Sequence, residues 1–480
     1  MKAPLTLIAL ALAGVLTACT VGPDYVRPSA PVSTAYKEAP DWKTAQPADT
    51  APRGRWWRVF DDAALDALAD QVGPANQNVQ AALAQYRQAR AAVAAAEAAY
   101  TPTVSIDGSL QRARSTSSSR AASIGDSDRL NALDASWVPD LWGQVARSVE
   151  GDRATAQYNA ATLAAVRLAA EAQLVQAYFQ LRVTDAYHKL QRNTVEGYER
   201  SLKVTQNQRA AGLVSQADVA QAQAQLESAR ASLIDLGVSR AQYEHAIAIL
   251  IGKAPADFSL PEGVLSPTLP TLPAALPSQL LERRPDIAAA ERRMAAANAE
   301  IGVAQAAYYP KLSLSASAGF SASTLGNWLS LPNRVWAVGG TLAETVFDGG
   351  ARDAKVQQAR ASYDATVAQY RQTVLAGLQE VEDNLVALRV YGEEFVVQER
   401  AVRAAREAER IAMNQYLAGM TTYVNVVVAQ TTTNTSERSA YQLLGRRYTA
   451  AVTLIKALGG GWDGVAAEMG RIAQGATPAP

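Results

Sequence analysis

Apolar positions recur with a seven-residue period through a long stretch that lacks proline. No proline occurs between Pro139 and Pro255 or between Pro332 and Pro478. In the first stretch, residues spaced by seven form two rows, one of Val219, Leu226, Leu233 and Ile247, which Arg240 interrupts, and one of Ala222, Ala229, Leu236, Tyr243 and Leu250. This period predicts coiled-coil packing. An unbroken helix over about 143–212 would reach on the order of 100 Å, far beyond the span of a compact domain.

A second pattern, apolar residues alternating with small or polar ones, precedes each long helix and predicts strands. The first strand pair covers about 103–139 and the second about 310–347. We expect polar loops at Arg112–Arg129 and Ser321–Arg334 to join the strands of each pair. An ordinary soluble sheet gives the same alternation as outer-membrane strands, so both interpretations stay open on this pattern alone.

The two halves of the chain match when the sequence is slid along itself by about two hundred residues. The matching segments are Tyr100-Thr101-Pro102 with Tyr308-Tyr309-Pro310, Leu181-Arg182-Val183 with Leu388-Arg389-Val390, and Ala211-Gly212 with Ala418-Gly419. This match predicts an internal duplication, with one structural repeat over 61–265 and the other over 266–465. Two copies are fewer than the roughly three that a solenoid needs, so we interpret the repeat as pseudo-symmetry.

The N-terminus predicts a secreted lipoprotein. Lys2 precedes an apolar run over 5–16, which is too short to span a bilayer. Thr17-Ala18-Cys19 follows this run, with small residues just before the expected cleavage point. We expect 1–18 to be a removed signal peptide and Cys19, the chain's one cysteine, to carry a covalent lipid such as palmitate. Residues 19–60 would form a lipid-anchored extended segment, and 466–480 a disordered tail. Thr20 follows the cysteine, where an Asp would favour inner-membrane retention, so the outer membrane is the expected location.

Four strands of roughly ten residues match the height of an outer-membrane barrel, but closed barrels need at least about eight strands. One chain therefore cannot close a barrel. A cyclic homotrimer in which each subunit contributes four strands would supply twelve, and we state this assembly as a hypothesis.

Composition limits the remaining function classes. Lys plus Arg number 45 and Asp plus Glu also number 45, so no net charge attracts nucleic acid. The two histidines, His188 and His245, belong to no metal-binding motif. Gly459, Gly461 and Gly464 match the spacing of a dinucleotide motif but follow a predicted helix instead of a strand. We expect no enzymatic activity, no metal site and no cofactor apart from the lipid.

Several motifs together resemble one family. They are Cys19-Thr20-Val21-Gly22-Pro23-Asp24-Tyr25, Trp56-Trp57, Leu280-Leu281-Glu282-Arg283-Arg284-Pro285-Asp286-Ile287, Tyr309-Pro310-Lys311-Leu312-Ser313-Leu314, Trp137-Val138-Pro139-Asp140-Leu141-Trp142-Gly143 and Phe347-Asp348-Gly349-Gly350. With these motifs nearly the whole mature chain resembles the outer-membrane factors, which include TolC and the NodT-type efflux lipoproteins. The resemblance implies an α+β membrane protein of two internal repeats. A long α-helical coiled-coil barrel would cross the periplasm and continue into a twelve-stranded trimeric transmembrane β-barrel.

The resemblance also implies a function and partners. The chain would be the passive exit duct of a tripartite efflux pump, of the kind linked to antibiotic resistance. Substrates would come from an inner-membrane transporter of the resistance-nodulation-division class through a periplasmic adaptor. Two alternatives stay open, the exit duct of a type I protein-secretion system and a structural coiled-coil lipoprotein without a pore. The sequence does not show whether drugs, solvents or metals are exported.

By the same resemblance, the periplasmic helix tips carry the adaptor-docking residues and the gate. The docking residues would be Arg209, Gly212, Leu213 and Val214 at the first tip and Gly419, Met420 and Thr421 at the second. The gate would involve Tyr423, Val424, Val428 and Asp218. Relatives have an aspartate where Val428 stands, so we expect an apolar gate that resists ions by dewetting.

Overall fold

The computed structural model describes residues 20–30, 36–38, 54–115, 123–265, 269–270, 284–322 and 329–475, of which 109–115, 123–132, 322 and 474–475 are described by backbone alone. The chain divides into two compact units. Unit 1 comprises 1–29, 85–159 and 289–370, and unit 2 comprises 30–84, 160–288 and 371–480. Each unit therefore contains segments of both expected repeats. The expected signal peptide over 1–18 and the expected lipid-attachment residue Cys19 lie outside the described residues.

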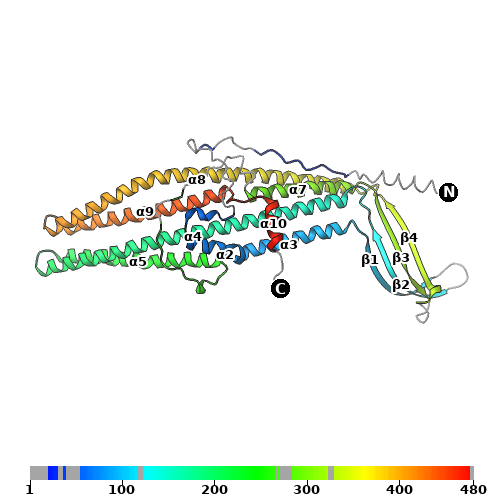
Figure 1. Ribbon diagram of the computed structural model, residues 1–480, viewed down its shortest axis with the longest axis horizontal. Helices are drawn as coiled ribbons and strands as arrows, with labels where there is room; N and C mark the ends of the chain where they lie inside the picture. The colour runs from blue at the N-terminus through cyan, green and yellow to red at the C-terminus, as the bar shows by residue number, and fades with distance from the viewer. Residues whose placement is uncertain are drawn as a thin grey trace. The chain divides into compact units, whose positions relative to one another are not determined.

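Unit 1 contains an antiparallel sheet of four strands in the order β1-β2-β3-β4 (Figure 1). The strands are β1 (Thr103–Ser115), β2 (Ser123–Trp137), β3 (Lys311–Ala322) and β4 (Arg334–Ala343), the last preceded by the 3₁₀ turn η4 (Leu331–Asn333). Large apolar side chains are exposed on this sheet, among them Val104, Ile106, Trp336, Val338 and Leu342. The predicted strand pairs are confirmed.

The expected loop at Arg112–Arg129 is wrong at both ends. β1 continues to Ser115 and β2 begins at Ser123, and the two strands pair up to Ser115 opposite Ser123. Ser and Arg made this segment resemble a loop. A hairpin is held by backbone hydrogen bonds, however, and its exposed positions accept polar side chains. The second expected loop is shortened only at its edges, because β3 includes Ser321 and β4 begins at Arg334.

Several helices of the described residues belong wholly or mainly to unit 2 or cross between the units, and the longest of them lie within the proline-free stretches. They are α2 (Ala63–Ala75), α3 (Gln77–Ala98), α4 (Gln144–Ala210), α5 (Gln216–Leu250), α8 (Ala351–Leu417) and α9 (Tyr423–Ala457). α7 (Pro285–Ala306) lies mainly in unit 1, and η2 (Pro255–Asp257) follows α5. α4 and α8 each have 67 residues, and α5 and α9 each have 35. No helix among the residues described is both long and apolar enough to cross a membrane.

The heptad rows of α5 face its partner helix. Val219, Ala222, Leu226 and Ala229 are buried, and the last two pack against Val195 and other residues of α4. The predicted coiled-coil packing is therefore confirmed for this pair, in which α5 runs beside α4, as α9 runs beside α8 (Figure 1).

A larger apolar core lies in unit 2, where the short N-terminal helices pack on the long ones. Trp56 and Trp57 of η1 (Trp56–Phe60) are buried there with Leu65 of α2. Phe179 of α4 stacks on Tyr448 of α9 at a centroid distance of 4.2 Å. The expected extended segment 19–60 is therefore wrong at its end. Residues 56–60 form a 3₁₀ turn because this conformation lets their bulky apolar side chains pack into the core.

The expected disordered tail over 466–480 is also wrong for most of its length, because α10 spans Val465–Gly475. Glu468 is 1% exposed and accepts hydrogen bonds from Arg167 of α4 and from Arg471, while Ile472 packs against the core. These contacts order a segment that composition alone marked as a tail. Residues 476–480 lie outside the described part of the chain.

Candidate functional site

The first tip is a glycine turn between α4 and α5. Gly212 has φ +77°, a conformation that glycine adopts without strain. The Leu213 N–H donates to the Gln208 carbonyl at 2.9 Å, which closes the last turn of α4 as in a Schellman motif. The Leu213 side chain is 74% exposed, and Arg209 is also exposed. Val214 instead packs, partly buried, against an apolar cluster to which α5, α8 and α9 contribute.

The second tip repeats this geometry between α8 and α9. Gly419 has φ +71°, and the Met420 N–H donates to the Gln415 carbonyl at 2.8 Å. The Met420 side chain is 72% exposed, whereas the Thr421 hydroxyl accepts a hydrogen bond from the Asn425 side chain. Each tip thus presents one large exposed apolar side chain next to its glycine.

Two of the four predicted gate residues share an exposed face of α9. Val424 and Val428 are one helical turn apart and are 57% and 59% exposed. Such a pair is an apolar face with no partner in the described part of the single chain. The structure shows its position, and the gating role stays a prediction.

The other two predicted gate residues have structural contacts. Tyr423 is 1% exposed, its ring packs against Tyr416, and its hydroxyl lies 3.1 Å from that of Ser201. Asp218 forms a capping box with Ser215, accepting from the Ser215 N–H at 2.9 Å while the Ser215 hydroxyl caps the Asp218 N–H. Tyr423 therefore does not share the exposed face of Val424, and Asp218 fixes the start of α5.

Sequence reasoning missed the seam along which α4 meets α9. The hydrogen bonds between side chains across it include Gln176–Thr453 at 3.0 Å, Gln180–Thr449 at 3.0 Å, Asn434–Gln191 at 3.0 Å and Ser201–Tyr423 at 3.1 Å. The sequence feature that could have indicated this polar seam is the run Gln430-Thr431-Thr432-Thr433-Asn434-Thr435-Ser436. Thr, Asn and Ser are weak helix formers, so a run of them inside a predicted helix indicates a tertiary role.

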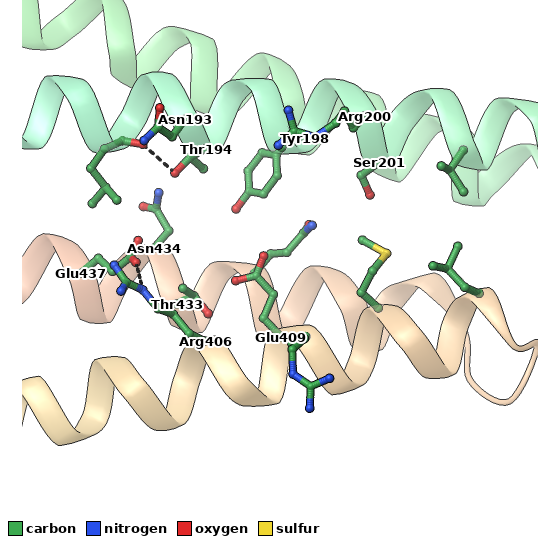
Figure 2. Close-up of a pocket in the computed structure, with 17 residues that line it drawn as sticks. Asn193, Thr194, Tyr198, Arg200, Ser201, Arg406, Glu409, Thr433, Asn434 and Glu437 are labelled. Atoms are coloured by element: carbon green, nitrogen blue, oxygen red, sulfur yellow. Dashed lines mark hydrogen bonds and ion pairs between the residues drawn. The ribbon is translucent and has the colours of Figure 1, made fainter.

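A cleft of about 580 Å³ opens beside this seam, between α4 and the α8–α9 pair (Figure 2). Tyr198 of α4 points into it from one side and Glu409 of α8 from the other (Figure 2). On its floor Glu437 of α9 is 6% exposed and accepts a hydrogen bond from Arg406 at 2.6 Å. Burial raises the pKa of the Glu409 carboxyl, and the nearby Glu437 raises it further.

Metal-binding geometry is not found in the described part of the chain, where no three His, Cys, Asp or Glu side chains gather to hold an ion. His188 lies 3.3 Å from Glu262, in an ordinary surface contact. The glycines at 459, 461 and 464 have positive φ and lie in the turn between α9 and α10.

Comparison with known proteins identifies the family. The family model for "Outer membrane efflux protein" matches 68–253 and 276–460. The chain is 31% identical over 466 residues to the probable efflux pump outer membrane protein TtgC of Pseudomonas putida, covering 95% of this chain and 96% of that protein. It is 31% identical over 462 residues to outer membrane protein OprJ of Pseudomonas aeruginosa, covering 95% of each.

Solved structures agree with this match. The outer-membrane channel OprN has a TM-score of 0.84 and 32% identity, covering 92% of this chain and all (100%) of that one. The MtrE outer membrane channel of Neisseria gonorrhoeae, solved in its open state, has a TM-score of 0.79 and 25% identity, covering 92% of this chain and 98% of that one. The chain belongs to the outer membrane efflux protein family. It is thus an outer-membrane efflux channel protein, as the sequence predicted.

Proposed function

We propose that three copies of this chain form a closed passive duct, with a twelve-stranded barrel in the outer membrane and an α-helical barrel below it. The observation that carries this proposal is the sheet of unit 1. β1 and β4 each pair on one side only within the described residues. Open edges cannot face lipid, so they require partner strands from other subunits. The exposed side chains of Ile106, Trp336 and Val338 fit a lipid-facing surface.

The duct would be built on an internal duplication. The matched lengths of α4 with α8 and of α5 with α9 support it, as does the order helix, strand pair, long helix, short helix in each half. A trimer of two-fold repeats would place six similar helix pairs around the duct axis.

We further propose that the tips dock a periplasmic adaptor, which couples the duct to an inner-membrane transporter of the resistance-nodulation-division class. Leu213 and Met420 support this role because each is a large apolar side chain, 74% and 72% exposed, at a tight turn. Val424 and Val428 would form the apolar gate just above the tips. The chain would have no catalytic role.

Lipid attachment at Cys19 would anchor the duct to the outer membrane. The adjoining segment, residues 20–30, which we call the N-terminal strap, supports this proposal because all of it up to Ser29 belongs to unit 1 and is hydrogen-bonded there. The Val21 N–H donates to the Trp142 carbonyl at 3.1 Å, and Arg147 donates to the carbonyls of Val21 and Gly22. Cys19 directly precedes this strap, which is fixed at the junction of β2 and α4.

The relatives are named for efflux of different compounds, such as toluene for a TtgC protein of Pseudomonas putida and antibiotics for ArpC of the same species. We propose small organic compounds as the exported class. A protein-secretion duct remains the second candidate, and the lipoprotein start favours small-molecule efflux over it.

The mass of the purified protein in detergent tests the assembly. Three chains per particle support the duct, and one chain per particle rejects it.

A further inference from the structure

The cleft between α4 and the α8–α9 pair has the size and lining of a small-molecule site. Its volume of about 580 Å³ lies within the roughly 300–1,000 Å³ of typical ligand pockets. Apolar side chains form much of its lining, namely Leu190, Val204, Met413 and Leu417. Polar groups enter from both sides, with Tyr198 facing Glu409 across the opening (Figure 2).

Two polar atoms in the lining lack a hydrogen-bond partner among the described residues, the Gln430 amide oxygen and the Thr433 hydroxyl oxygen. Gln430 of α9 lines the cleft, is 3% exposed, and its Oε1 has no hydrogen-bond partner among the described residues. A buried acceptor without a donor costs free energy, and native proteins rarely leave one unsatisfied. A ligand that brings a donor into the cleft would satisfy it.

Charged groups of both signs line the cleft. Arg406 is paired with Glu437 at 2.6 Å, and Arg410 is paired with Glu407, also at 2.6 Å. Glu409 forms no ion pair with any Lys or Arg of the described chain, although it points into the cleft. Of the groups left over, the Glu409 carboxylate and the Gln430 amide oxygen are acceptors, the Thr433 hydroxyl can accept or donate, and the exposed Arg200 guanidinium is a donor.

We propose that this cleft binds a small amphipathic organic amine, with its ammonium group held by Glu409 and Gln430 and its apolar body against Leu190, Met413 and Leu417. An ammonium group carries three donors and a positive charge, which matches a carboxylate and an orphan amide oxygen. The apolar lining disfavours a hydrated metal ion. Binding at this site is separate from transport, so it is measured without flux.

The test is calorimetric titration of the full-length mature protein in detergent with 1-naphthylmethylamine as the probe. The neutral analogue 1-naphthylmethanol has the same apolar body and controls for partition into the micelle. We expect saturable binding of one amine per chain and at least about tenfold weaker binding of the alcohol, as for loss of a charge-assisted hydrogen bond. Equal affinity for amine and alcohol would overturn the proposal.

Variants locate the site. Glu409→Gln keeps the shape of the side chain and should weaken amine binding at least about tenfold. Gln430→Met removes the orphan acceptor, so it should weaken binding while leaving the melting temperature unchanged or higher. Glu399→Gln is the matched control, because Glu399 is exposed on the same helix outside the cleft. Unchanged binding in Glu409→Gln, or an equal loss in Glu399→Gln, would reject the site. The amine–alcohol comparison on the unaltered chain decides the case if a variant fails to fold.

Discussion

The hydroxyl oxygens of Ser201 and Tyr423 lie 3.1 Å apart and join α4 to α9 in a buried contact next to the tips. Removing it with Tyr423→Phe should lower the free energy of unfolding by about 1 kcal/mol, the usual net value of such a hydrogen bond. Ser201→Ala should cost a similar amount. Because the two hydroxyls serve each other, the double variant should cost about as much as either single one, as measured by denaturant unfolding. Additive losses would show that the two hydroxyls do not stabilise each other.

The apolar gate is tested at Val424 and Val428. Val424→Ser should raise single-channel conductance because it makes the constriction easier to wet. Val428→Asp should shift selectivity toward cations by adding a ring of carboxylates. Val428→Thr is the matched control, since it keeps the branched shape without charge. If Val424→Ser and Val428→Asp both conduct like the parent protein, the gate lies elsewhere.

Glu171 should make stability depend on pH. It is 7% exposed, and burial raises the pKa of its carboxyl from 4.5 to about 7, although Arg167 and the Trp56 indole N–H counteract the rise. The folded protein then binds a proton that the unfolded chain has released, so stability should fall as pH rises from about 4.5 to about 7. A shift of this size corresponds to roughly 3 kcal/mol.

Glu171→Gln removes this ionisation and keeps an acceptor for Trp56. The variant should therefore melt at a higher temperature than the parent at about pH 8 and at a similar temperature at about pH 4.5. Thermal unfolding followed by circular dichroism across this range measures the difference. A constant offset between the two proteins at every pH would show that Glu171 is already ionised in the fold.

The tip glycine turns expose Met420, and the docking proposal depends on that exposure. Met420→Asp should abolish efflux in cells while leaving the trimer mass and bilayer conductance unchanged, because it changes only an exposed surface. Ala404→Asp adds the same charge at an exposed position of α8 away from the tip. Docking elsewhere is indicated if Met420→Asp cells remain as resistant as Ala404→Asp cells.

The packing of the N-terminal strap is tested at Gly22, where the strap passes close to Gly302. A Cβ on Gly22 would come within 2.5 Å of Gly302 Cα, whereas a Cβ on Gly54 would meet nothing within 4 Å. Both glycines have positive φ, +104° and +99°, so alanine at either carries a similar backbone penalty of ~1–2 kcal/mol.

Gly22→Ala should therefore displace the strap and expose residues 20–30 to protease, and Gly54→Ala should not. Limited proteolysis with mass detection measures the cleavage. Equal protection of residues 20–30 in both variants would show that the close packing at Gly302 does not hold the strap.

The sequence predicted the parts of the fold that depend on local pattern. The absence of proline placed a helix over about 143–212, and α4 spans Gln144–Ala210. The glycines of Ala211-Gly212 and Ala418-Gly419 placed both tips within a residue, since a tight reversal needs positive φ there.

The features that depend on tertiary contact were not predictable in this way. Glu468 orders α10 by pairing with Arg167, which lies 301 residues earlier in the chain. The cleft needs Tyr198 and Glu409 to face each other across two helix pairs, and no period in either helix encodes that meeting. The burial of Tyr423 likewise depends on which face of α9 meets α4. Such pairings follow from packing of distant segments, which a single sequence does not reveal.

The central claim, that this chain forms a trimeric outer-membrane duct, is tested most directly by single-channel recording of the purified mature protein in planar bilayers, with its mass measured in the same detergent. Our account predicts stepwise conductance from a particle of three chains. A monomeric protein that does not conduct would contradict it and would favour a lipoprotein that tethers the envelope without a pore.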